Sequence, residues 1–143
     1  MNYILDTNVI SELVAAQPTP EVLAWLDGLD PQSVYLSVIT IGELKKGIEK
    51  LQGSKRKKEL ESWLSNDLLL RFKDRVLNLD TPVLLRWGTM AADLERKGRP
   101  LPALDLLLAA TASQAGYTLA TRNTLHFEAT GISAIDPWRV DAG

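Results

Sequence analysis

The chain alternates short apolar runs, rich in β-branched and aromatic residues, with longer stretches of helical periodicity. This alternation is typical of a parallel sheet that is covered by helices. The expected strands are Tyr3–Leu5, Val34–Val38, Val76–Leu79, Thr118–Ala120 and Ser133–Ile135. The sequence therefore predicts an α/β fold with a five-stranded, mainly parallel sheet flanked by helices.

Helical periodicity fills the segments between these strands. Helices are expected around Val9–Ala15 and Glu21–Leu29, on both sides of Gly53, and from Pro82 to Gly98. The last one follows Pro102 and runs through Ala112. It is apolar almost all round, which predicts that it is buried, Leu104 included. Because no repeat or long linker divides the chain, we expect a single domain over residues 1–143.

Composition excludes several classes of protein. The absence of cysteine excludes disulfides, zinc–thiolate sites, iron–sulfur clusters and cysteine nucleophiles. No apolar run approaches the ~20 residues that a membrane helix needs, and no basic stretch precedes an apolar one at the N-terminus. We therefore expect a cytoplasmic protein that does not contact a membrane.

Charge is unevenly distributed, although the net charge is only -2. Residues 1–44 contain six acidic and no basic side chains, whereas residues 45–75 contain ten basic and five acidic ones. A metal-dependent enzyme that acts on a polyanion could use an acidic segment beside a basic one, but many basic helix faces are simply solvated. Charge alone leaves both interpretations open.

Three carboxylates occupy unusual positions for surface acids. Asp6 follows the first expected strand, where open α/β sheets bind ligands, although a helix N-cap explains it equally well. Glu43 follows the second strand, and Thr40 to Glu43 also fits a capping box. Asp105 lies near the start of the apolar helix, where the helix dipole offsets only part of the cost of burying a charge. The carboxyl ends of parallel strands meet at one edge, so the three acids are expected to converge.

Converging carboxylates repel one another, and a divalent cation would remove this conflict. A ligand set made only of oxygen atoms favours Mg²⁺ or Mn²⁺ over zinc or copper. In such sites the metal activates a water and stabilises the charge that develops on a phosphodiester. The sequence thus predicts a site for Mg²⁺ or Mn²⁺ at Asp6, Glu43 and Asp105.

The segment after the fourth expected strand supplies further polar candidates. Asn123 could ligate a metal, orient a water or only form a turn. His126 is the only histidine, and without the partners of a catalytic histidine it is expected to be a surface residue or a support for the site. Arg122 and Arg99 could contact phosphate, and salt bridges to neighbouring acids would explain them as well.

Three motifs stand in order along the chain: Leu5-Asp-Thr-Asn-Val-Ile-Ser-Glu12, Ser37-Val-Ile-Thr-Ile-Gly-Glu-Leu44, and Asp105-Leu-Leu-Leu-Ala-Ala-Thr-Ala112 followed by Leu119-Ala-Thr-Arg-Asn-Thr124. Together, and with a likeness that extends to Asp136-Pro137-Trp138, they resemble the PIN-domain ribonucleases, specifically the VapC and FitB-like toxins of type II toxin–antitoxin modules. The resemblance implies an α/β/α sandwich and Mg²⁺- or Mn²⁺-dependent endonucleolytic cleavage of RNA, such as tRNA or another structured RNA. It also implies a homodimer and inhibition by a cognate antitoxin in a hetero-oligomer.

The resemblance carries the metal-site acids of the family onto Asp6, Glu43 and Asp105. Many members have a fourth aspartate where this chain has Asn123, which we expect to take part in catalysis. Asn8 is expected to hold Asp6 through a hydrogen bond, and Thr121 is expected to support the site as well.

Basic residues beyond Glu43 are candidates for binding the RNA backbone. The side chains expected to do so are Lys45, Lys46, Lys50 and Arg122. The cluster Lys55–Lys58 lies farther along, past Gly53, and could equally meet an acidic partner.

Two other functions stay open. A haloacid-dehalogenase-like phosphatase also begins with a strand and an aspartate, but it requires a second aspartate where Asn8 stands. A non-catalytic PIN-fold module that binds a partner or has a regulatory role would keep the fold and would not need the three acids. Stabilisation by Mn²⁺ would separate such a module from a metal-dependent enzyme.

Overall fold

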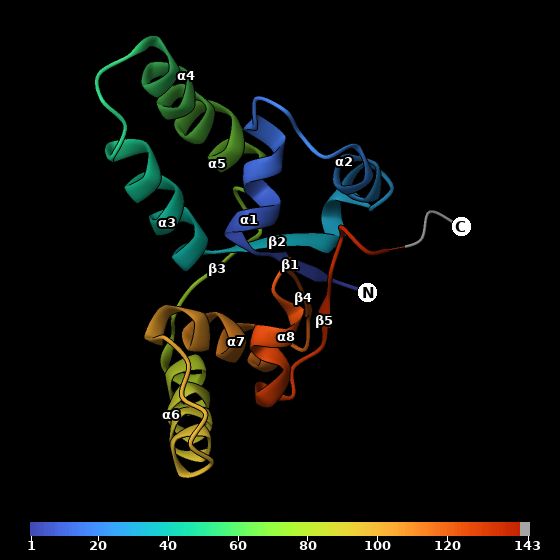
Figure 1. Ribbon diagram of the computed structural model, residues 1–143, viewed down its shortest axis with the longest axis vertical. Helices are drawn as coiled ribbons and strands as arrows, with labels where there is room; N and C mark the ends of the chain where they lie inside the picture. Colours follow the sequence, from blue (N-terminus) through green and yellow to red (C-terminus); the bar gives the residue numbers. More distant parts are fainter. Residues whose placement is uncertain (141–143) are drawn as a thin grey trace.

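In the computed structural model, residues 1–140 are described and form a five-stranded sheet with helices on both faces (Figure 1). The strands are β1 (Tyr3–Leu5), β2 (Val34–Ser37), β3 (Val76–Leu77), β4 (Thr118–Ala120) and β5 (Ala134–Ile135), in the spatial order β3-β2-β1-β4-β5. Every neighbouring pair is parallel. The expected α/β/α sandwich is confirmed. Residues 141–143 of the expected single domain lie outside the described residues.

Helical segments make the crossovers between the strands. Those from β1 to β3 are α1 (Thr7–Ile10), η1 (Ser11–Val14), α2 (Pro20–Asp27), η2 (Pro31–Ser33), α3 (Val38–Glu49), α4 (Lys55–Trp63), the π-helical turn η3 (Leu64–Leu68) and α5 (Leu69–Arg71). Those from β3 to β5 are α6 (Thr81–Arg96), α7 (Ala103–Ala115), α8 (Thr124–Phe127) and η4 (Glu128–Thr130). None of the helices in residues 1–140 combines the length and the apolar character that crossing a membrane requires.

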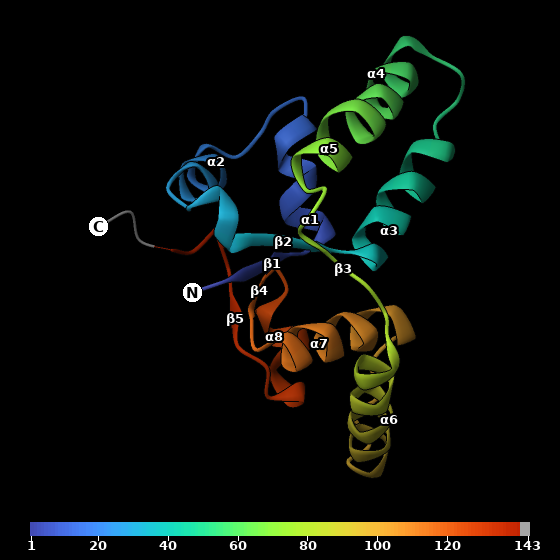
Figure 2. The same ribbon diagram turned by 180° about the vertical axis from the view of Figure 1, so that it is seen from behind.

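Each strand contributes to two cores, because successive side chains of a strand point to opposite faces of the sheet. In β1, Leu5 packs among residues of α1 to α5, whereas Ile4 packs among residues of α6 to α8. In β4, Ala120 and Leu119 divide between the two cores in the same way. Figure 2 shows both helical layers from behind. Since both faces are covered, β1 and β4 are mostly apolar. The exception is Thr118 at the start of β4, whose Oγ1 is hydrogen-bonded to Ser133 Oγ at 2.9 Å.

The start of α3 differs from the expectation. Ser37 ends β2 and caps α3, since its Oγ accepts a hydrogen bond from the backbone N–H of Ile39 at 3.1 Å. Thr40 therefore lies inside the first turn, where its Oγ1 is buried without a hydrogen-bond partner in the described part of the chain. The expected capping box from Thr40 to Glu43 is wrong, because the cap lies three residues earlier.

Other boundaries shift by a few residues. The strands β3 and β5 are two residues long, shorter than expected, and the first expected helix divides into α1 and the 3₁₀ turn η1.

The core side of α7 is fully buried at Ala109 and Ala112, but Leu104 is 52% exposed. Leu104 belongs to the first turn of α7, beside a surface pocket that Leu79 also lines, so its expected burial is wrong.

Candidate active site

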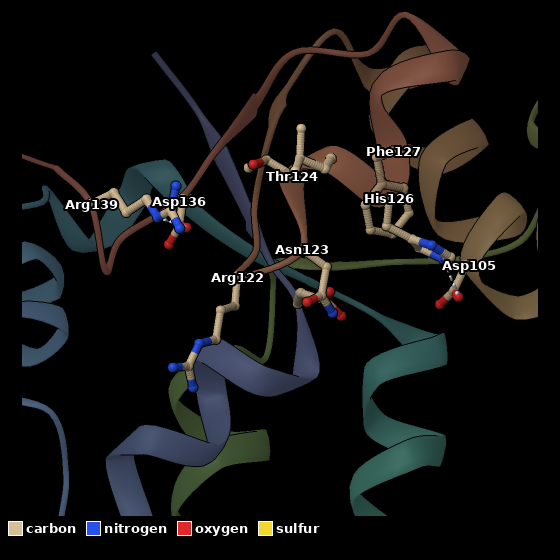
Figure 3. A pocket seen from close by; sticks show the side chains of 10 residues that line it. Asp105, Arg122, Asn123, Thr124, His126, Phe127, Asp136 and Arg139 are labelled. Atoms are coloured by element: carbon tan, nitrogen blue, oxygen red, sulfur yellow. Dashed lines mark hydrogen bonds and ion pairs between the residues drawn. The ribbon is translucent and has the colours of Figure 1, made fainter.

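Polar side chains gather at the carboxyl edge of the sheet. Asp6 directly follows β1, Arg122 and Asn123 follow β4, and Asp136 directly follows β5. Because β1, β4 and β5 are neighbours, these residues line one pocket of about 530 Å³, which the first turn of α7 joins through Asp105 (Figure 3).

Asp6 connects the sheet to this pocket. Its Oδ1 accepts a hydrogen bond from the backbone N–H of Thr7, and its Oδ2 accepts one from Thr121 Oγ1, both at 2.7 Å. Asp6 is therefore the N-cap of α1 and also lines the pocket, so both sequence interpretations hold.

The surroundings of Asp6 oppose its negative charge. Burial raises the pKa of Asp6 above its ordinary value of 3.8, and the charges of Glu43 and Asp105 raise it further, while the hydrogen bonds from Thr121 and Thr7 lower it. Glu43 and Asp105 thus both act electrostatically on Asp6.

Glu43 reaches the site through Thr7. The Oγ1 of Thr7 donates a hydrogen bond to Glu43 Oε1 at 2.7 Å, while the backbone N–H of the same threonine binds Asp6. One residue therefore fixes two of the three acids relative to each other. Sequence reasoning missed Thr7, and its only signal was a hydroxyl residue next to the aspartate that follows β1.

Asp105 faces the only histidine of the chain. Its Oδ2 lies 2.9 Å from His126 Nε2, and both side chains are about one third exposed, at 37% and 38%. Figure 3 shows the two side chains pointing toward each other from α7 and α8. His126 is therefore part of the site, held against one of the candidate metal ligands.

Thr121 and Asn8 divide the supporting role differently from the expectation. The hydroxyl of Thr121, which is fully buried, donates to Asp6 and accepts the backbone N–H of Asn123 at 3.1 Å. Asn8 instead receives the backbone N–H of Arg122 at 3.3 Å, and its Nδ2 lies 3.5 Å from Thr121 Oγ1. The expected hydrogen bond from Asn8 to Asp6 is wrong, because the side-chain amide of Asn8 instead bonds to Arg122 and Thr121 in the loop after β4.

Asn123 is the residue before α8. The turn is formed by its backbone, since its carbonyl accepts the N–H of His126 at 3.0 Å. The side chain of Asn123 does not cap α8, and it lines the pocket. The turn and a role of the amide in the site are therefore compatible.

The basic candidates lie at two margins of the site. Lys45 is paired with Glu49 at 2.8 Å, which raises the pKa of Lys45. Lys46 is exposed and lines the same surface pocket as Glu43, and Lys50 is exposed at the end of α3. On the other margin, the guanidinium of Arg122 lies over the ring of Trp138, 5.0 Å from its centroid.

The donor set fits a hard divalent cation. Asp6, Glu43 and Asp105 offer only oxygen atoms, and their mutual repulsion at Asp6 is what a bound cation would relieve. In residues 1–140, however, no three histidine, cysteine or acidic side chains are gathered closely enough to form a ready metal-binding group. Glu43 and Asp105 are instead hydrogen-bonded to Thr7 and His126. Each of these hydrogen bonds uses one carboxylate oxygen, so the other oxygen could still ligate a metal.

Comparison with known proteins identifies the fold family. A model of the PIN domain matches residues 3–132. The chain belongs to the PIN-domain family. Toxin FitB of Neisseria gonorrhoeae is 40% identical over 135 residues, which cover 94% of this chain and 97% of FitB. VapC ribonuclease Y4jK of Sinorhizobium fredii is 38% identical over 135 residues, which cover 94% of this chain and 96% of that protein.

A solved structure agrees with this membership. The crystal structure of FitAcB from Neisseria gonorrhoeae superposes with a TM-score of 0.92 at 39% sequence identity, over 96% of this PIN-domain chain and 99% of that chain. The resemblance of the motifs to the VapC and FitB-like toxins is confirmed.

Proposed function

We propose that this PIN-domain protein is the toxin of a toxin–antitoxin module and an endoribonuclease that depends on Mg²⁺ or Mn²⁺ and cleaves tRNA or another structured RNA. The observation that carries the proposal is the half-buried Asp6, which lines a pocket of about 530 Å³ together with Asp105 and is linked to Glu43 through Thr7. Burial raises the pKa of Asp6, and the charges of Glu43 and Asp105 raise it further. The similarity to a protein named as a VapC ribonuclease and to one named as a toxin supports the same activity.

The polar residues around Asp6 divide into metal ligands and residues that support them. Asp6, Glu43 and Asp105 would hold the metal, which when bound supplies an activated water and charge stabilisation at the scissile phosphate. Thr121 and Thr7 favour the ionised form of Asp6, which is the form that can ligate. Asn123 adds a neutral amide that can accept or donate a hydrogen bond, so the site has three formal negative charges from its acids.

His126 supports this arrangement. Its Nε2 contacts one oxygen of Asp105, as a hydrogen-bond partner commonly does for a metal-binding side chain, and so restricts the rotation of the carboxylate.

Part of α3 is proposed to guide the RNA backbone. Glu43, Lys46 and Lys50 are three and seven residues apart, so they share one face of α3 and extend about 10 Å away from the acids. Lys45 contributes less, because its ammonium group is paired with Glu49. Each lost phosphate contact should lower the salt slope of single-strand binding by about 0.7, so Lys46→Ala and Lys50→Ala should each show this reduction, and Lys45→Ala should show a smaller one.

Substitution of Asp105 tests the catalytic proposal. Asp105→Asn should abolish cleavage of RNA in Mg²⁺ while circular dichroism shows an unchanged fold. Asp67→Asn, which alters an exposed aspartate in η3, is the matched control and should cleave normally. A folded Asp105→Asn protein that cleaves RNA at nearly the wild-type rate would remove Asp105 from the mechanism.

Mapping of RNA 5′ ends after brief induction, against an Asp6→Asn strain, would identify the RNA that is cut.

Thermal denaturation with Mn²⁺ distinguishes an enzyme from a module that only binds partners. One site that is saturated at 100 times its Kd should stabilise the protein by about 2.7 kcal/mol. The Asp6→Asn protein should lose this stabilisation. A wild-type protein without any such stabilisation would favour the non-catalytic module.

Assembly is proposed from the family resemblance: a homodimer that binds a cognate antitoxin. Light scattering after size exclusion should give twice the mass of the 15.8 kDa chain, and a larger complex with antitoxin that no longer cleaves RNA. A chain that elutes as a monomer at micromolar concentration would contradict the homodimer.

A further inference from the structure

The pocket extends beyond Asp6 and Asp105 to a second wall, formed by the segment after β5. The backbone N–H of Thr121 binds the carbonyl of Ile135 at 2.9 Å, which holds β5 beside β4. Asp136 therefore follows β5 at the same sheet edge at which Asp6 follows β1. Arg122, Asp136 and Arg139 all line the pocket, and Figure 3 shows Asp136 and Arg139 facing each other at the side away from Asp105.

Asp136 is fixed in place by its own segment. Its Oδ1 accepts the backbone N–H of Trp138 at 2.9 Å, its Oδ2 lies 3.7 Å from Arg139 Nε, and the side chain is only 13% exposed. The carboxylate keeps lone pairs that these contacts do not use, because each oxygen can accept more than one hydrogen bond. Asp136 is thus an oriented acceptor on the wall of the pocket.

Two arginines flank this acceptor. Arg139 is 86% exposed at its side chain, and Asp136 is its one acidic neighbour among residues 1–140 within salt-bridge distance. Arg122 is exposed and is steadied by the indole of Trp138, and the described residues give it no acidic partner. The side chain of Leu125, 82% exposed, adds an apolar surface to the same pocket. Positive charge, an acceptor and an apolar surface therefore lie beside the proposed cleavage site.

We propose that this wall binds the nucleotide next to the scissile phosphate, a step that rests on the proposed ribonuclease function. Arg122 and Arg139 contact the phosphate backbone, Leu125 contacts the base, and Asp136 accepts a hydrogen bond from an amino group of the base. The pocket volume of about 530 Å³ lies within the range of about 300–1,000 Å³ that is usual for sites of small ligands.

The chemistry of Asp136 sets a preference among bases. An ionised carboxylate only accepts hydrogen bonds, so it favours cytosine, whose N4 amino group is a donor, over uracil, whose O4 is an acceptor. An asparagine at the same place both donates and accepts, so it can bind either pyrimidine. Asp136 is therefore the residue that determines specificity at this position.

Binding to oligonucleotides without divalent metal tests the inference apart from catalysis. Fluorescence anisotropy of the full chain in EDTA, with labelled hexacytidylate and hexauridylate as probes, should show tighter binding of hexacytidylate by about 5-fold or more. Asp136→Asn should bring the two affinities together. Arg122→Gln and Arg139→Gln should each lower the salt slope for both probes by about 0.7. Arg96→Gln on α6 and Asp67→Asn in η3, both at exposed positions, are the matched controls and should change neither quantity.

Three outcomes of the binding assay would overturn the inference: no binding of either probe by the wild-type chain, salt slopes unchanged in both arginine variants, or the same probe preference in wild type and Asp136→Asn. A loss of Mn²⁺ affinity in Asp136→Asn would also overturn it, because Asp136 would then be a metal ligand. Failure of the ribonuclease proposal is recognised separately, since it would appear as absent cleavage in Mg²⁺ and not in these binding data.

Discussion

Replacing Thr121 with valine removes one hydroxyl and keeps the shape of a fully buried side chain. That hydroxyl donates to Asp6 at 2.7 Å and accepts the backbone N–H of Asn123 at 3.1 Å. A hydrogen bond to a charged group contributes about 1.5–3 kcal/mol, so Thr121→Val should lower the free energy of unfolding by about this amount at pH 7. Urea denaturation in EDTA measures the loss without any contribution from bound metal.

Thr111 provides a matched control in the core. It is 2% exposed, and its hydroxyl donates to the backbone carbonyl of Leu107 at 2.8 Å, which is a neutral acceptor inside α7. A neutral hydrogen bond contributes about 0.5–1.5 kcal/mol, so Thr111→Val should cost clearly less than Thr121→Val. Equal losses in the two variants would show that the charge of Asp6 adds nothing to the hydrogen bond.

The dependence on pH follows from the raised pKa of Asp6. A group whose pKa is raised by folding contributes its full stability below the unfolded value, here near 3.8, and loses it as the pH rises through the folded pKa. Thr121 lowers the folded pKa, so its removal raises that pKa further and enlarges the loss. The cost of Thr121→Val should therefore be larger at pH 7 than at pH 4. A cost that does not change between these two pH values would refute the reasoning.

The remaining predictions use the same denaturation assay, apart from the last. Thr40→Val removes a buried hydroxyl that lacks a partner within residues 1–140 and should stabilise the protein by about 1 kcal/mol, whereas a loss would reveal a hydrogen bond there. Gly116→Ala places a Cβ at a φ of +72° and should cost about 1–2 kcal/mol; no cost would mean that the turn relaxes. Leu108→Ala, at a position 1% exposed, should cost about 2–5 kcal/mol, and Leu104→Ala, at one 52% exposed, should cost much less. Asn123→Asp adds a charge and should strengthen Mn²⁺ binding in calorimetry without RNA, and unchanged affinity would leave Asn123 as a turn residue.

The sheet could be predicted from the sequence because each buried parallel strand is a short apolar run between helical segments. The position of Asp6 after such a run was enough to place it at the sheet edge. The end of β2 could not be placed as well, because Val38 suits a strand as much as a helix. The hydroxyl of Ser37 decides the boundary by capping α3.

The partners of the site residues could not be predicted, because they join distant segments. Thr121 binds Asp6 across 115 positions, and His126 contacts Asp105 across 21. These pairs depend on the register of β4 against β1 and on where α7 and α8 lie on the sheet. Local spacing carries no information about either. It therefore predicts a hydrogen bond to Asp6 from its near neighbour Asn8, whereas the structure has this bond from Thr121.

The central position of β1 has a consequence for synthesis of the chain. Strand β1 is the first to be translated, but its partner β4 begins at Thr118, late in the chain. A nascent chain that has emerged only through β3 carries Asp6 and Glu43 but lacks Asp105, Thr121 and the loop that forms the pocket. Under the proposed function, the site is therefore completed only near the end of translation, when β4 pairs with the free edge of β1, and a prematurely terminated product should not cleave RNA.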